Sequence, residues 1–190
     1  YFTEAAQATR TGDKFVTFLP SGGGLAFRWQ ETKPKQEVKL FYSVNGMGQV
    51  TVSPGLMRQM TVLDYKVMQG EMRELTVELE GEGSVTRVDG KNILTWKPEE
   101  VDGKRLLKVQ LNTVQKSAYQ LTIHTQTPLG AFPLKVGPVR FVPVDAIRYG
   151  GHIRVVNQGA VRLEVLDAPG LAQISPQRFP ATKLLPTLDP

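Results

Sequence analysis

The chain contains no cysteine among its 190 residues. This absence excludes disulfide bonds, thiolate nucleophiles and cysteine metal ligands, and with them the disulfide-dense secreted scaffolds. Histidine is also scarce, since His124 and His152 are the only two. Neither has a second histidine or a carboxylate nearby at the spacing of a zinc site. We therefore expect no metal and no cofactor.

Sequence signatures of common enzymes are missing as well. There is no Gly-x-Ser-x-Gly nucleophile elbow, and the glycine run at 22–24 lacks the Lys-Ser/Thr of a phosphate-binding loop. The adjacent acids Glu99 and Glu100 are predicted to lie in an exposed loop, where carboxylates usually serve solubility rather than glycoside hydrolysis. These observations favour a protein that is not an enzyme.

Long hydrophobic runs are absent. No stretch approaches the roughly 18 apolar residues that a membrane helix needs, so we expect no membrane span in this segment. The chain begins with Tyr1 rather than methionine. This start predicts that the sequence is a piece of a longer polypeptide.

The basic residues do not cluster, although the net charge is +5. The densest basic patch, at 33–39, is interrupted by Glu37. A nucleic-acid surface needs a continuous basic stripe with stacking aromatic side chains. We therefore expect no nucleic-acid partner.

What the chain does have is a hydrophobic rhythm with a period of two. Alternating apolar and polar residues are typical of strands that bury one face and expose the other. The rhythm predicts an all-β protein with little or no helix, built as an antiparallel β-sandwich of the immunoglobulin-like or super-sandwich type. The clearest stretches are Leu75/Val77/Leu79, Leu107/Val109/Leu111, Tyr119/Leu121/Ile123 and Val161/Leu163/Val165.

Turn residues between these stretches predict the strand boundaries. Asn45-Gly46 is typical of a tight hairpin turn, and 56–60 is the only stretch with a helical character. The predicted strands cover 14–19, 25–29, 38–44, 49–52, 62–68, 73–80, 84–88, 92–96, 105–111, 118–125, 139–142, 152–156 and 160–166.

Three regions are predicted from this pattern. They are an N-terminal β region at 1–60, a main β-sandwich at 61–174 and a proline-rich tail at 175–190 that we expect to be extended. One continuous sandwich over 1–174 is the alternative.

Aromatic side chains provide the only candidate ligand site. Flat aromatic rings on one exposed face could stack on sugar rings. However, Trp29 shares a strand face with Phe27, and Trp96 shares one with Leu94, which favours packing in the core. The candidate ligand-binding residues are Trp29, Tyr42, Trp96 and Tyr149.

The strand-like stretches between residues 60 and 165 have a recurring composition. They are RELTVEL at 73–79, VTRVDG at 85–90, LTW at 94–96, LKVQL at 107–111 and YQLTI at 119–123. This succession resembles the β-rich modules of large uncharacterised exported bacterial proteins, in which a strand, a Val-x-Gly turn and a strand ending in Trp recur. The resemblance implies a β-sandwich, a periplasmic or extracellular setting and no known catalytic residues.

The sequence thus predicts a non-catalytic structural or protein-interaction module of a larger bacterial envelope or secreted protein. The edge strands of an open sandwich could pair with a protein partner or with a second copy of the chain. A carbohydrate-binding module, with a glycan as ligand, is the alternative, and a glycosidase-like enzyme comes third.

Overall fold

A computed structural model describes residues 9–11, 13–16, 21–22, 39–131, 133–159 and 161–186. The chain divides into two compact units, residues 1–36 and 37–190. In the first unit, β1 (Thr9–Thr11) pairs antiparallel with β2 (Lys14–Val16). The strand predicted at 25–29, which contains Trp29, lies outside the described residues.

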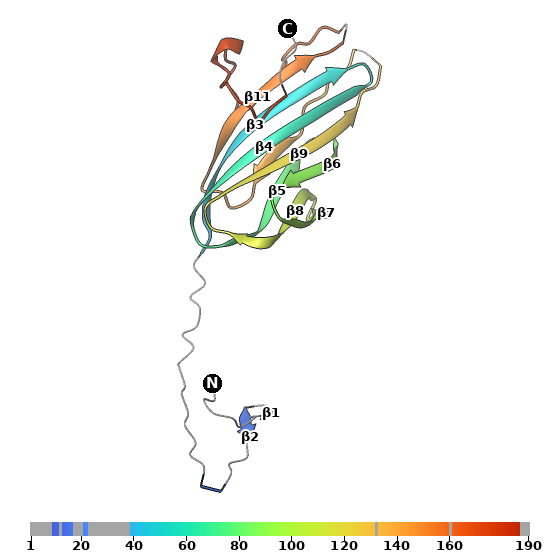
Figure 1. The fold of residues 1–190 in the computed structure, drawn as a ribbon. Helices are drawn as coiled ribbons and strands as arrows, with labels where there is room; N and C mark the ends of the chain where they lie inside the picture. The colour runs from blue at the N-terminus through green and yellow to red at the C-terminus, as the bar shows by residue number, and fades with distance from the viewer. Residues whose placement is uncertain are drawn as a thin grey trace. The chain divides into compact units, whose positions relative to one another are not determined.

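The second unit is a sandwich of two β-sheets (Figure 1). All neighbouring strands are antiparallel except β11 and β3, which are parallel. The all-β, mostly antiparallel sandwich predicted from the sequence is therefore confirmed. The five-stranded sheet has the order β11 (Arg148–Asn157), β3 (Phe41–Ser53), β4 (Leu56–Gln69), β9 (Ala118–Pro128) and β6 (Ser84–Gly90), and the four-stranded sheet has the order β10 (Arg140–Pro143), β5 (Met72–Glu80), β8 (Lys104–Gln115) and β7 (Ile93–Val101).

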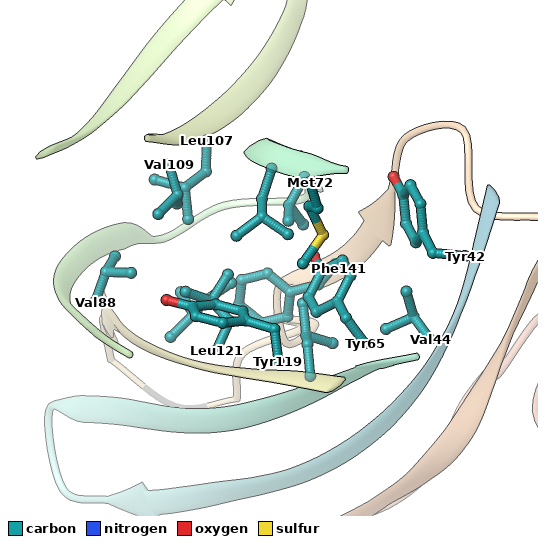
Figure 2. Packing of buried hydrophobic residues seen from close by; sticks show 14 of the residues in the cluster. Tyr42, Val44, Tyr65, Met72, Val88, Leu107, Val109, Tyr119, Leu121 and Phe141 are labelled. Atoms are coloured by element: carbon teal, nitrogen blue, oxygen red, sulfur yellow. The ribbon is translucent and has the colours of Figure 1, made fainter. Parts of the chain in front are cut away.

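The core lies between the two sheets and is built from the alternating positions of their strands (Figure 2). Three of the four alternating stretches fill it, on β5, β8 and β9, and each of their nine apolar side chains is buried. Burying one such side chain contributes about 1.5–3 kcal/mol, so this alternation is the main reason that the chain folds as it does. Among the described residues, helix is limited to the short 3-10 turn η1 (Pro176–Arg178).

The hairpin predicted at Asn45-Gly46 is wrong. Strand β3 runs without interruption from residue 41 to 53, and the turn comes at Pro54-Gly55, where Gly55 has a φ of 75°. Gly46 serves close packing instead, because a Cβ at this position would lie 3.2 Å from the hydroxyl of Tyr149 on the neighbouring β11.

Two further local predictions are wrong. Residues 56–60 are not helical but begin β4, where Met57 and Gln59 are buried. Residues 161–166 have the strand rhythm but pair with no strand in the described part of the chain. An alternating pattern forms a ladder only where a partner strand is available. The preceding strand, β11, pairs with β3 and not with residues 161–166.

The boundary predicted between residues 60 and 61 falls inside β4. Strands β3 and β4 are paired along their lengths, from Phe41 opposite Gln69 to Ser53 opposite Leu56. The two strands therefore belong to the same compact unit, which begins at residue 37.

The described part of the C-terminal tail, 175–186, folds back onto the outer face of the five-stranded sheet. We call the outer face the side away from the core. Leu185 is buried there against Met47 and Val62, and Phe179 packs beside them. The guanidinium of Arg154 lies 5.5 Å from the ring of Phe179 and donates a hydrogen bond to the carbonyl of Pro186. The tail therefore covers apolar side chains that the strands alone would leave exposed.

A buried glutamine links the two sheets. Gln59 on β4 accepts a hydrogen bond from the backbone N–H of Val139 at 2.9 Å and donates one to the carbonyl of the same residue at 2.9 Å. Val139 directly precedes β10 of the other sheet. The side-chain amide thus replaces the backbone partner that Val139 lacks.

Two tyrosine hydroxyls in the core, on Tyr65 and Tyr119, have no hydrogen-bond partner among the described residues. Burial raises the pKa of Tyr65 well above its ordinary value, and the neighbouring tyrosines Tyr42, Tyr149 and Tyr119 raise it further. The Tyr65 hydroxyl is therefore held neutral and unbonded inside the core, an arrangement that costs free energy of folding.

Replacing Tyr65 with phenylalanine is expected to raise the free energy of unfolding by about 1 kcal/mol, because it removes this unsatisfied group. The raised pKa also makes the native chain lose stability as pH rises above about 10, the ordinary tyrosine pKa. The phenylalanine variant should lose less stability than the native chain between pH 7 and pH 10.5. Urea unfolding at these two pH values measures both effects. If the variant were clearly less stable than the native chain at pH 7, the Tyr65 hydroxyl would not be an unsatisfied group.

Candidate functional site

The aromatic residues predicted to bind a sugar do not form one exposed platform. Trp29 lies outside the described residues. Tyr42 is buried, its ring centroid is 5.6 Å from that of Tyr65, and its hydroxyl donates to the carbonyl of Val144. The same burial raises the pKa of the Tyr42 hydroxyl. Because the side chain is buried, its ring has no free face on which a sugar could stack.

The other two candidates lie in different sheets. Trp96 is on β7 of the four-stranded sheet, opposite Val109, and packs against the core while partly buried. Tyr149 is on β11 of the five-stranded sheet, 41% exposed, and its ring lies close to Gly46. Only the ring of Tyr149 is substantially open to solvent among the three described candidates.

The candidate acids also sit in an ordinary setting. Glu99 and Glu100 belong to β7 rather than to a loop, so the loop prediction is wrong. Glu99 forms ion pairs with Lys108 at 3.0 Å and Lys97 at 3.3 Å. Hydrogen bonds from Lys108 and then Lys97 lower the pKa of Glu99. The Glu99 carboxylate therefore forms ordinary ion pairs with exposed lysines on a solvent-facing side of the sheet.

The two histidines lie apart, each with its own neighbour. The Nε2 of His124 is 3.3 Å from a carboxylate oxygen of Asp89, whereas His152 meets the ring of Phe179 edge-on at 6.0 Å. No group of three or more His, Asp or Glu side chains could hold a metal ion in the part of the chain that the structure describes.

An open hollow of about 940 Å³ lies on the five-stranded sheet, beside the first half of β11. The strand register places Arg148, Ser43 and Lys66 in one row across the sheet, and Asp64 and Gln120 in the next. Gln120 donates a hydrogen bond of 2.8 Å to Asp64. The hollow mixes both signs of charge with amides, so it offers no concentrated charge for one class of ligand.

The most unusual surface follows β11, over residues 161–174. A turn built by Asn157 positions its start: the side-chain oxygen accepts the N–H of Gly159 at 3.1 Å, and the side-chain nitrogen donates to the carbonyl of Val161 at 2.6 Å. Val161 then packs against the buried Val50 and Met57. The turn and this contact fix where the next residues leave the sandwich.

The residues after Val161 expose large apolar side chains. Within the described part of the chain, the backbone groups of residues 162–167 make no hydrogen bond to other backbone groups. Soluble proteins rarely expose such groups of apolar side chains without a function. The exposed side chains are Leu163 at 45%, Val165 at 77%, Leu166 at 66%, Leu171 at 61% and Ile174 at 39%.

Strand β11 adds a sheet edge to this surface. Figure 1 shows β11, in orange, at the end of the five-stranded sheet, with β3 on one side. Its core-facing Val155 is 56% exposed. We call residues 161–166 the pairing segment, and treat it with β11 as the candidate interaction site. Sequence reasoning found the pattern of this segment but predicted that it would be buried.

Comparison with known proteins adds no function. No family model matches the chain, and no curated protein matches it. Among solved structures, a two-domain M1 zinc metallopeptidase variant bound to L-tryptophan is similar over 52% of this chain and 23% of that chain, with 11% identity and a TM-score of 0.35. The M1 zinc metallopeptidase from Deinococcus radiodurans is similar over 55% and 24%, with 12% identity and a TM-score of 0.30. The chain thus spans about a quarter of these proteins, and a likeness this weak carries no argument about activity.

Within the part of the chain that the structure describes, no helical segment has the length and hydrophobicity of a membrane span.

Proposed function

We propose that the chain is a non-catalytic β-sandwich module of a larger bacterial envelope or secreted protein, and that it acts by binding another protein chain through the pairing segment and β11. The observation that supports the proposal is the combination at residues 162–166 of exposed apolar side chains and backbone groups that have no backbone partner among the residues the structure describes. Such a segment is a ready template for adding a strand from a partner.

A protein partner fits this surface better than a sugar does. A sugar site needs aromatic rings gathered on one face together with polar groups. Here the large exposed side chains of the segment are aliphatic, namely Leu163, Val165 and Leu166. Aliphatic side chains beside unpaired N–H and C=O groups are the features that a β-strand of another chain would satisfy.

Site-specific photo-crosslinking tests the proposal. A photoreactive residue is placed at Leu166, which is 66% exposed, and a control is placed at Lys97, whose side chain is 72% exposed on the four-stranded sheet. After irradiation in cells of the source organism, we expect a protein adduct at Leu166 but not at Lys97. Equal labelling at both positions, or no adduct at Leu166, would contradict the proposal.

A further inference from the structure

The pairing segment has a charge pattern that matches itself. The side chains of Arg162 and Glu164 form an ion pair at 3.0 Å, which places them on the same side of the extended backbone. The apolar Leu163 falls between them. The segment therefore carries one basic and one acidic side chain at equal distances from a central leucine.

We propose that a second copy of this chain is the partner, and that two pairing segments join as antiparallel strands across a two-fold axis at Leu163. This inference rests on the proposed function, and names the occupant of that same site. In this register Leu163 of each copy lies opposite Leu163 of the other. Arg162 of each copy then lies opposite Glu164 of the other, which gives two ion pairs, and Val161 of each copy lies opposite Val165 of the other.

Charge complementarity argues for this register and against its alternatives. Opposite charges directly across an antiparallel pair are favourable, and like charges are unfavourable. A parallel in-register pair would place Arg162 opposite Arg162 and Glu164 opposite Glu164. The antiparallel pair also places Val161, Leu163 and Val165 on one face and Arg162 and Glu164 on the other, and a two-fold axis closes the assembly as a dimer.

The unpaired backbone and the exposed side chains are consistent with this pairing. Each segment brings N–H and C=O groups that lack a backbone partner within the described residues. An isolated pair of short strands is marginally stable in water. The dimer is therefore weak, and it depends on the concentration of the chain and on salt, since the ion pairs are exposed.

Charge reversal provides the test, because the side chains of Arg162 and Glu164 are 88% and 59% exposed and their substitution leaves the fold intact. Sedimentation equilibrium of the purified chain is measured from about 10 μM to about 1 mM in low salt. Arg162→Glu alone and Glu164→Arg alone should each weaken self-association by about ten-fold or more. The double variant should associate again, as should an equimolar mixture of the two single variants.

Arg58→Glu is the matched control, because Arg58 is exposed on β4, and this variant should associate like the native chain. A native chain that stays monomeric at 1 mM would overturn the inference, as would single variants that associate normally or a mixture that does not associate. If the native chain is monomeric but Leu166 crosslinks a different protein, the proposed function stands and the self-pairing fails. If neither occurs, both fail.

Discussion

Replacing Gln59 with leucine is expected to lower the free energy of unfolding by about 2–6 kcal/mol. The side-chain amide bonds to both backbone groups of Val139, at 2.9 Å each, where Val139 is only 2% exposed. Leucine has a similar size but can neither donate nor accept. Both backbone groups of Val139 would then be buried without a partner, and each such group costs about 1–3 kcal/mol.

Urea unfolding followed by circular dichroism measures this effect. Gln110→Leu is the matched control, because Gln110 is an exposed strand residue on β8. We expect that variant to remain within about 0.5 kcal/mol of the native chain. If Gln59→Leu were equally mild, the link between β4 and β10 would not contribute to stability.

Replacing Gly151 with alanine is expected to destabilise the sandwich by about 3 kcal/mol or more, because backbone atoms cannot move aside as side chains can. A Cβ at residue 151 would overlap the backbone carbonyl of Gly46. The two glycines lie directly opposite each other in the parallel pair of β11 and β3. The substitution should therefore separate β11 from the sheet.

The neighbouring Gly150 provides the control for this prediction. A Cβ at residue 150 would meet no atom within 4 Å, so Gly150→Ala should leave stability nearly unchanged. Amide hydrogen exchange then locates the damage, since Gly151→Ala should remove protection along β11 first. Equal stability of the two variants would contradict the close approach of the strands.

The alternation of apolar and polar residues was sufficient to predict that the chain forms a β-sandwich. The rhythm of Leu107, Val109 and Leu111 predicts a strand with one buried face, and β8 has that face in the core. Strand alternation depends on neighbours within a few residues. For this reason the predicted ranges overlap every strand of the second unit, and the ends of β5, β6, β9 and β10 agree with the prediction to within three residues.

Long-range contacts explain what the sequence could not show. Asn45-Gly46 has the chemistry of a turn, yet Gly46 lies inside β3 and packs closely against Tyr149 of β11, which follows it by more than 100 residues. The buried role of Gln59 likewise depends on Val139, 80 residues away. No local pattern carries either relation.

The sequence was also insufficient to predict the candidate interaction site. Residues 161–166 have a strand pattern as clear as that of β8, but the structure gives them no partner among the described residues. A sequence pattern indicates that a segment can pair, and does not indicate with what. The sequence likewise could not show that Tyr42 is buried, because its hydroxyl bonds to the carbonyl of Val144, 102 residues away.

Backbone amide hydrogen exchange of the native chain, resolved by residue and measured at about 10 μM and about 1 mM, tests the central claim most directly. In the dilute sample, the amides of residues 162–166 should exchange freely while those of β11 facing β3 are protected. At the higher concentration the amides of 162–166 should gain protection. If they are protected at 10 μM, or remain unprotected at 1 mM, the segment is not a free strand that pairs with its own copy.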